Sequence, residues 1–161
     1  MGSGKSYWGR QWAAINHLSF VDLDELIEKE AHTSIAQIFE EKGEDHFRSR
    51  EAFLLREQLA NDNCIIACGG GTPCFHDNMH WMNEHGLTIF LSSSPQFILK
   101  NVKGEKEKRP MIKNPDEEGI LSFIRQKLKE RAFFYNKAQL TLEAENLLPE
   151  SLSSVLSLPY Q

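Results

Sequence analysis

The segment Gly2-Ser3-Gly4-Lys5-Ser6 opens the chain and constrains its fold more than any other part of the sequence. Glycines permit the positive backbone φ angles and the close approach that a loop wrapped around phosphate oxygens needs. In such loops, backbone N–H groups and a Lys hold the phosphates, and a Ser hydroxyl binds Mg²⁺ where a helix begins. The segment therefore predicts a phosphate-binding loop that leads into a helix. The alternative is a flexible Gly/Ser start ahead of a helix.

The motif is only part of the full pattern G-x-x-x-x-G-K-[ST]. The first Gly of that pattern, and the strand that leads into it, would both lie before Met1. We therefore expect this chain to lack the central first strand of its sheet. Either the native start lies upstream and Met1 is an internal methionine of the loop, or the sheet is rebuilt by other means.

Length and charge limit the classes of protein to which the chain can belong. Its 161 residues suit one compact domain, and its net charge of −5 argues against a broad nucleic-acid-binding surface. Its apolar stretches span only a few residues, far fewer than a transmembrane helix needs. The sequence therefore predicts a single cytoplasmic domain over residues 1–161 that binds neither nucleic acid nor a membrane.

Three cysteines, Cys64, Cys68 and Cys74, lie close together in the sequence. The first two fall within an apolar strand pattern, which favours buried, reduced thiols in a cytosolic protein. A metal site that includes His76 and His80 is the alternative, and the absence of a C-x₂-C pair argues against it.

Apolar strand patterns alternate with helical patterns along the chain. Strands are expected at about 17–21, 64–68, 87–91 and 140–142, and helices at about 5–16, 25–31, 34–43, 44–60, 115–136 and from 149 onward. Strands that alternate with helices form a parallel sheet covered on both faces, with ligands at the carboxyl ends of the strands. The pattern therefore predicts an α/β fold, in which the continuous apolar run 64–68 is a strand buried on both faces.

Capping signals and apolar spacing define the predicted helices more closely. Ser34 and Gln37 form a plausible capping box, and Gly43 is expected to end the helix that this box begins. The side chains expected to face the core are those of Trp8, Trp12, Ile15, Phe47, Leu54, Leu55 and Leu59.

Residues suited to ligand chemistry follow two of the predicted strands. Asp22 and Asp24 come after the first strand, and Gly69-Gly70-Gly71 after the next. Three consecutive glycines cost chain entropy, which favours a reason such as close approach of the backbone to a ligand. For the two aspartates, capping of the following helix is the alternative to a role in catalysis. The Lys-rich segment 100–108 is either a solvated charged loop or part of a lid over phosphate.

Taken together, these motifs resemble the shikimate kinase family of small phosphate-loop kinases. The resemblance runs from Gly2 to about residue 138, in the motifs Gly-Ser-Gly-Lys-Ser (2–6), Phe-Val-Asp-Leu-Asp (20–24), Ser-Ile-Ala-Gln-Ile-Phe (34–39), Gly-Glu-x-x-Phe-Arg-x-x-Glu (43–51), Gly-Gly-Gly (69–71), Arg-Pro-Met-Ile (109–112) and Arg-Ala-Phe-Phe-Tyr (131–135). It implies a monomeric, Mg²⁺-dependent enzyme that transfers the γ-phosphoryl group of ATP to the 3-hydroxyl of shikimate, in aromatic amino acid biosynthesis.

The resemblance assigns the nucleotide side of the site to the start of the chain. The residues implied to bind ATP are Gly2, Ser3, Gly4, Lys5, Ser6, Tyr7 and Arg109. Ser6 and Asp22 match the Mg²⁺ site of the family, and Lys5 and Arg109 match its catalytic cations. Arg109 would act from a lid over about 100–115.

The substrate side is assigned to residues spread over the chain, including a helical segment at about 25–61. Asp24 matches the carboxylate that meets the reacting hydroxyl and acts as base. Arg48 and Arg131 match the arginines that clamp the carboxylate of shikimate, a geometry that suits a guanidinium fork. Gly69, Gly70 and Gly71 match the glycine loop beside the substrate ring. For Arg48, a surface ion pair with Glu44 or Glu51 is the alternative.

Two positions depart from the pattern of the family. Tyr7 stands where the family usually has Thr, which alters one phosphate contact. Asn101 and Val102 occupy the places of an Arg that packs on adenine, and Lys100 or Lys103 is the candidate substitute.

Two other functions remain open from the sequence. One is a kinase of another small hydroxy acid or polyol, as in gluconate kinases. The other is a catalytically impaired phosphate-loop remnant that binds anions or a partner.

Overall fold

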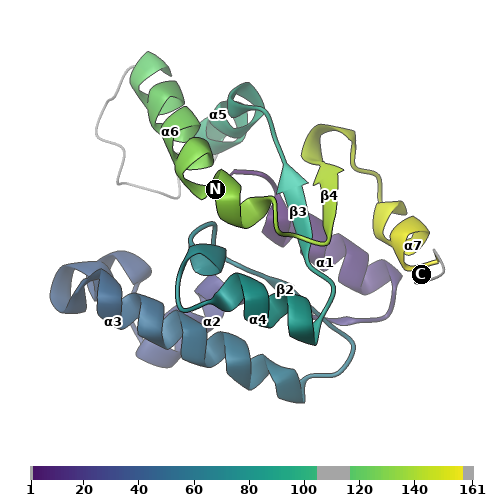
Figure 1. The fold of residues 1–161 in the computed structure, drawn as a ribbon, viewed down its shortest axis with the longest axis horizontal. Coiled ribbons are helices and arrows are strands. Elements are labelled where there is room, and N and C mark those ends of the chain that lie inside the picture. The colour runs from purple at the N-terminus through teal and green to yellow at the C-terminus, as the bar shows by residue number, and fades with distance from the viewer. Residues whose placement is uncertain (1, 105–116, 158–161) are drawn as a thin grey trace. The chain divides into compact units, whose positions relative to one another are not determined.

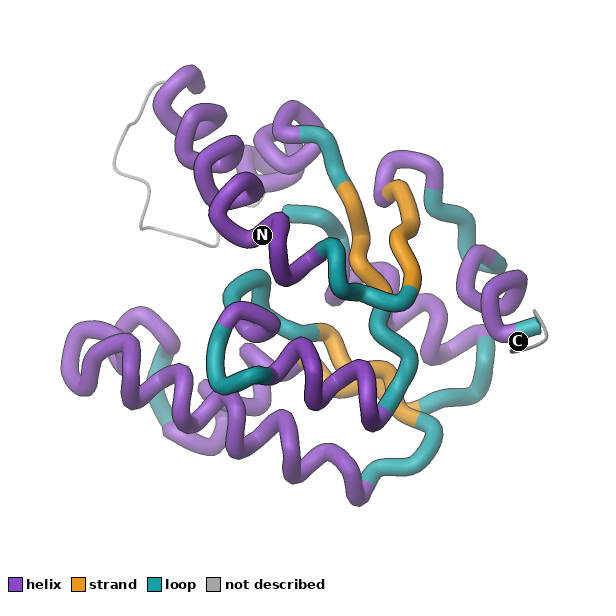
Figure 2. The backbone as a smooth tube through the Cα atoms, in the orientation of Figure 1, coloured by secondary structure: helices purple, strands orange, loops and turns teal. Residues whose placement is uncertain are grey.

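The computed structural model describes residues 2–104 and 117–157 (Figure 1). The chain divides into two compact units, each containing helices and a pair of parallel strands (Figure 2). The larger unit comprises Lys5–Gly86 and Leu148–Gln161, and the smaller unit comprises Met1–Gly4 and Leu87–Leu147. The single domain expected from the sequence stays a prediction.

The larger unit is built around two parallel strands and the helices that connect them. Its elements are α1 (Lys5–Ile15), β1 (Ser19–Asp22), α2 (Leu23–Ala31), α3 (Ile35–Glu57), η1 (Gln58–Ala60), β2 (Cys64–Ala67), η2 (Thr72–Cys74), α4 (Asn78–His85) and α7 (Ser151–Leu156). Strands β1 and β2 pair in parallel, and Asp22 lies opposite Ala67 at their carboxyl ends. This register brings the segment that begins at Asp22 alongside the glycines that follow β2.

Local signals in the sequence set the helix boundaries of this unit. The capping box is present, because the Ser34 hydroxyl accepts from the Gln37 backbone and Gln37 reaches back to the Ser34 N–H. Gly43 has φ 81° and ψ 172°, which are not helical, so the helix begun by the capping box ends at the expected residue and a second helix follows it within the span of α3. Such a φ lies in the region that glycine adopts most readily.

The core of the larger unit lies between α2 and α3. Its buried cluster consists of Leu23, Ile27, Ile38, Phe47, Leu54 and Leu55. The inward orientation predicted for Phe47, Leu54, Leu55 and Trp12 is confirmed. The prediction for Leu59 is wrong, because the chain tightens into the 3₁₀ turn η1 there and leaves that side chain 51% exposed. Ile15 is also exposed, at the residue where α1 ends.

The smaller unit contains the second strand pair and two packed helices. Its elements are β3 (Ile89–Ser92), α5 (Pro95–Gly104), α6 (Glu117–Tyr135), β4 (Leu140–Glu143) and η4 (Ala144–Asn146). Strands β3 and β4 are parallel, with Ile89 opposite Leu140. Helices α5 and α6 bury an apolar cluster made of Ile98, Val102, Ile120 and Ile124.

All four predicted strands occur and both pairings are parallel, so the predicted α/β class is confirmed. The expectation of one parallel sheet, with the strand at 64–68 buried on both faces, needs correction. In the described residues the strands form two separate two-stranded sheets, β1–β2 and β3–β4, and no strand joins them. In β2 only Ala67 is buried, and Cys64, Ile65 and Ile66 are partly buried. Both strands of a two-stranded sheet are edge strands, so β2 has a hydrogen-bonded neighbour on one side only, unlike a central strand.

Two helices were not foreseen from the sequence. Helix α4 follows the glycine loop, and α5 includes Lys100–Gly104, the first part of the segment expected to form a lid. Residues 105–115 of that segment lie outside the described residues. None of the helices described is long and apolar enough to cross a membrane.

Candidate active site

The backbone of the glycine-rich start has positive φ angles at two of its glycines. Gly2 and Gly4 have φ angles of 66° and 83°, and α1 begins at Lys5. At Gly2 a Cβ would lie 3.0 Å from Val102 Cγ2 and 3.1 Å from Ile98 Cγ2. The Asn101 side chain donates to the Gly2 carbonyl oxygen at 2.7 Å. Asn101 and Val102 thus place the start of the loop against α5.

Ser6 and Asp22 meet at the carboxyl end of β1. The Ser6 hydroxyl donates to Asp22 Oδ2 at 2.5 Å. Asp22 Oδ1 accepts from the backbone N–H groups of Asp24 at 3.1 Å and Glu25 at 3.4 Å, which caps α2. The capping alternative is therefore correct for Asp22, and it coexists with the contact to Ser6. Because Ser6 donates its proton to Asp22, the lone pairs of its oxygen are left for a cation.

This pair suits Mg²⁺ held chiefly by a nucleotide. In the described parts of the chain, no group of three or more His, Cys, Asp or Glu side chains lies together as a metal site. Mg²⁺ is commonly bound through one or two carboxylates, with substrate phosphates and waters as the other ligands. One hydroxyl beside one carboxylate, at the start of α1, fits that mode of binding.

Asp24 lies in the first turn of α2, beside the glycine loop that follows β2. A Cβ at Gly69 would lie 3.0 Å from Asp24 Oδ1, 3.2 Å from Thr72 Oγ1 and 3.3 Å from Glu51 Oε1. Several polar side chains therefore converge on the backbone of Gly69, as expected from the register of β1 and β2. Asp24 and the glycine loop, predicted as parts of one site, are adjacent.

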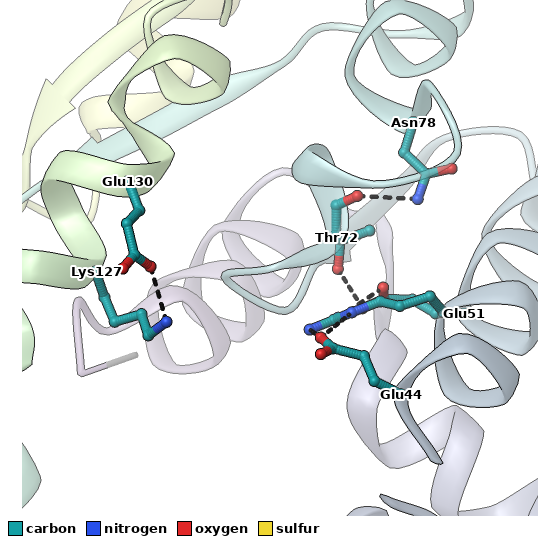
Figure 3. A network of polar contacts seen from close by, with 7 residues as sticks. Glu44, Glu51, Thr72, Asn78, Lys127 and Glu130 are labelled. Carbon is teal, nitrogen blue, oxygen red and sulfur yellow. Dashed lines mark hydrogen bonds and ion pairs between the residues drawn. The ribbon is translucent and has the colours of Figure 1, made fainter. Parts of the chain in front are cut away.

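Arg48 is held in the same region by two carboxylates of α3, those of Glu44 and Glu51, which Figure 3 labels. Its Nε and Nη2 groups both donate to Glu44 Oε1 at 3.1 Å, and Nη1 donates to Glu51 Oε2 at 3.0 Å. The ion pairs that were the alternative for Arg48 therefore both exist. They use three of the five N–H groups of a guanidinium, which leaves one N–H on each Nη atom.

The surroundings of Arg48 leave its guanidinium little room to move. The group lies 4.4 Å from the centroid of the Phe75 ring and 4.9 Å from that of Phe47. A Cβ at Gly71 would come within 2.6 Å of Nη2 and 2.8 Å of Nη1. The residue is only 9% exposed, which separates it from an ordinary surface ion pair. Position 71 therefore accepts only glycine without a shift of Arg48, because any Cβ there would overlap the guanidinium.

Glu51 and Thr72 belong to this site, although sequence reasoning gave neither a role in the site. Glu51 is fully buried and accepts from the Thr72 hydroxyl through Oε1 at 2.6 Å. The signal that could have identified Glu51 is a carboxylate three residues after Arg48, on the helix face that also carries Leu54 and Leu55. Thr72 carries no such signal beyond its place after three glycines.

The predicted residues Arg131, Lys103 and Arg109 belong to the smaller unit or to the part of the chain that the structure does not describe. Arg131, on α6 in the smaller unit, lines a small pocket of about 110 Å³ with Ile98, Phe123, Ile124, Lys127, Leu128 and Tyr135. Because Arg131 and Arg48 belong to different units, their joint role stays a prediction. Arg109 lies outside the described residues. Lys103, at the end of α5, forms an ion pair with Glu117 at the start of α6.

Tyr7, where the family usually has Thr, is 61% exposed on the first turn of α1. Its ring packs edge-on against Trp8, with centroids 5.2 Å apart, and Trp8 stacks on Trp12 at 5.8 Å. The side chain therefore extends an aromatic row along α1, and its predicted contact with a nucleotide stays a prediction.

The three cysteines are free thiols. Although part of Cys68 reaches the surface, its thiol is removed from water and lies 3.9 Å from Met82 Sδ. This burial, together with the negative charge of Glu51, raises the pKa of the Cys68 thiol to about 12. Such a thiol stays protonated and unreactive at neutral pH.

Comparison with known proteins gives a consistent result. The family model for shikimate kinase matches residues 1–157. The shikimate kinase of Parabacteroides distasonis is 41% identical over 151 residues, which cover 94% of this chain and 87% of that protein. That of Flavobacterium johnsoniae is 37% identical over 161 residues, which cover 98% of this chain and 94% of that protein.

Solved structures agree with the sequence comparison. The crystal structure of shikimate kinase from Bacteroides thetaiotaomicron superposes with a TM-score of 0.93 at 35% identity, covering 98% of this chain and 94% of that one. The structure from Acinetobacter baumannii, which is in complex with shikimate, gives a TM-score of 0.84 at 30% identity, covering 100% of this chain and 91% of that one.

Proposed function

The chain belongs to the shikimate kinase family, and on this premise we propose that it transfers the γ-phosphoryl group of ATP to the 3-hydroxyl of shikimate. Phosphoryl transfer depends on positioning and charge neutralisation more than on covalent chemistry by the protein. The residues that support the proposal are therefore those that can hold two anions and one hydroxyl in place.

The nucleotide side of the reaction rests on the start of the chain. Gly2 and Gly4, with positive φ angles, shape the loop, and α1 begins directly after them. The N-terminus of a helix favours phosphate through its unpaired N–H groups and its dipole. Lys5 would neutralise the phosphates. Ser6 and Asp22 would hold Mg²⁺, which, when bound, offsets the charge of the phosphate oxygens.

The acceptor side rests on Asp24, Arg48 and the glycine loop. Asp24 would accept the hydrogen bond of the 3-hydroxyl and orient its oxygen for attack, which a carboxylate can do even when the proton leaves late. Arg48 would bind the carboxylate of shikimate through its two remaining N–H groups. The proposal also includes three further residues: Arg131 as a second clamp on the carboxylate, Tyr7 at the nucleotide, and Arg109 on a lid over about 100–115.

The observation that carries this function is the burial of Arg48 beside the segment that holds Asp24. Glu44 and Glu51 fix this buried cation next to a bare glycine backbone, and one N–H on each Nη atom remains for a ligand. Those two N–H groups suit a carboxylate ligand, and the nearby Asp24 suits a hydroxyl of the same ligand.

A coupled assay of ADP release tests the proposal directly. MgATP is supplied with shikimate, with gluconate, and without an acceptor. Release that depends on shikimate supports the proposal. Release only with gluconate indicates a kinase of another hydroxy acid, and binding of ATP without any release indicates an impaired remnant.

A further inference from the structure

Arg56 and Asn78, which lie beyond the proposed site, form with Thr72 a continuous hydrogen-bonded chain that leads to Arg48. Arg56 Nη1 donates to Asn78 Oδ1 at 2.8 Å, and Asn78 Nδ2 donates to the Thr72 carbonyl oxygen at 2.9 Å. The Thr72 hydroxyl then donates to Glu51, the partner of Arg48. Figure 3 shows Thr72 between Asn78 and Glu51. Thr72 and Asn78 are both fully buried, so their polar groups form these hydrogen bonds in place of hydrogen bonds to water.

The outer end of this chain fixes a strained turn. His76 and Asp77 have φ angles of 48° and 54°, so two consecutive residues other than glycine are left-handed. Such backbone persists only where the surrounding structure holds it. Arg56 supplies that hold, because Nη2 donates to the His76 carbonyl oxygen at 3.0 Å and Nη1 donates to the Ala52 carbonyl oxygen at 2.8 Å. The turn is thereby tied to α3.

The inner end of the chain fixes the glycine loop. Gly69–Gly71 have no side chains with which to anchor themselves, and glycine backbone is the most mobile when it is not held. Thr72 closes the loop, since its N–H donates to the Gly69 carbonyl oxygen at 3.1 Å. Its carbonyl oxygen accepts from Asn78, and its hydroxyl donates to Glu51. The position of Thr72 therefore sets both the loop and the carboxylate that orients Arg48.

We propose that Thr72 and Asn78 are positioning residues for the acceptor site, with Arg56 as their anchor on α3. They do not touch the substrate. They hold Glu51 and the glycine loop so that Arg48 presents its remaining N–H groups to a carboxylate in one fixed orientation. This inference rests on the proposed function, since it assigns these residues to the binding of shikimate.

The first test compares Thr72→Val with Thr72→Ser. Valine keeps the shape of threonine and removes the hydroxyl that donates to Glu51, whereas serine keeps the hydroxyl. Losing a hydrogen bond to a buried carboxylate is expected to raise the KM for shikimate about tenfold in Thr72→Val. The KM for MgATP should stay unchanged, and Thr72→Ser should retain a KM for shikimate close to that of the unmodified chain.

The second test uses Asn78→Asp, which remains decisive where Thr72→Val does not fold. The variant keeps the size of the side chain and the acceptor for Arg56, but it sets an oxygen against the Thr72 carbonyl oxygen. The same selective rise in the KM for shikimate is expected. Asn61→Ala is the matched control, because Asn61 is exposed and its side chain donates to Gln58 in η1.

A double-variant comparison separates positioning from general destabilisation. When Arg48 is already replaced by Ala, Thr72→Val should raise the KM for shikimate no further, since residues that act through one another are not additive. Equal shikimate affinity in the unmodified chain, Thr72→Val and Asn78→Asp, measured by calorimetry, would overturn the positioning role alone. An equal loss for both substrates would also overturn it. An unmodified chain that binds no shikimate would instead overturn the proposed function, and this inference with it.

Discussion

Replacing Gly71 by Ala tests whether the glycine loop exists to make room for Arg48. The backbone at Gly71 has φ −90° and ψ −23°, which alanine adopts without strain, so the substitution acts only through its methyl group. That methyl would lie 2.6 Å from Arg48 Nη2, 2.8 Å from Nη1 and 2.9 Å from Cζ. Arg48 cannot simply swing aside, because Phe47 and Phe75 pack against it and Glu44 and Glu51 bind it.

The size of the effect follows from that geometry. Ordinary contact begins at 3.4 Å, so the guanidinium must move by roughly 0.8 Å, enough to break its 3.0 Å bond to the buried Glu51. A hydrogen bond to a charged group contributes about 1.5–3 kcal/mol. We expect Gly71→Ala to reduce the free energy of unfolding by about 2 kcal/mol, which lowers Tm by about 4–8 °C for a chain of this size. Shikimate affinity should fall by on the order of tenfold or more, with MgATP affinity unchanged.

The matched control is Gly86→Ala. A Cβ at Gly86 meets nothing within 4 Å, and its backbone is extended. This variant should match or slightly exceed the stability of the unmodified chain, because alanine restricts the unfolded state. Thermal melting and calorimetric titration with each substrate measure both variants. If Gly71→Ala bound shikimate as tightly as Gly86→Ala does, the close approach of Arg48 would have no functional meaning.

Four further predictions follow from individual side chains. Asp24→Asn should abolish turnover while nucleotide binding, measured by calorimetry, stays nearly intact, and near-normal kcat would refute its role. Asp22→Ala should lower both MgATP affinity and stability, the latter by about 1 kcal/mol from the lost helix cap, and an unchanged melting temperature would contradict the cap. Ser34→Ala should cost about 1 kcal/mol in denaturant unfolding without changing any KM. The pKa of the Cys68 thiol is higher in the folded protein than in the unfolded chain, so folding favours the neutral thiol. The free energy of unfolding should therefore fall as pH rises from about 9 to 12, where the unfolded chain loses this proton more readily. Alkylation followed by mass spectrometry should find Cys68 protected at pH 8 in the folded protein.

Local signals in the sequence predicted much of this structure because they act over a few residues. The capping box at Ser34 and the break at Gly43 depend on hydrogen bonds and φ angles that each residue type favours, and both are present. The resemblance to a family assigned Ser6 and Asp22 to one Mg²⁺ site, and the two side chains are in contact. The resemblance to a family also placed Asp24, Arg48 and the glycines in one site, although simple helical spacing allowed Arg48 to be an ordinary surface ion pair.

What the sequence did not reveal depends on contacts between distant segments. Asn78 is polar yet fully buried, because Thr72 and Arg56 satisfy its amide, and no local pattern signals such partners. Helix α4 begins after the left-handed Asp77 without a side-chain cap, so its start lacks the usual signal. The division into two strand pairs depends on which strands pair with one another. An apolar strand pattern predicts a strand at one segment but does not indicate its neighbour in the sheet.

The break in α3 at Gly43 has a consequence for the amino acids that this position can accept. A Cβ there would meet nothing within 4 Å, so the site has space for a larger side chain. Its φ of 81° nevertheless excludes most L-residues, because their Cβ would approach the backbone itself. The constraint is one of handedness, not of volume. A chain made by chemical synthesis with D-alanine at this position should keep the bend, whereas L-alanine, with the same atoms, should strain it.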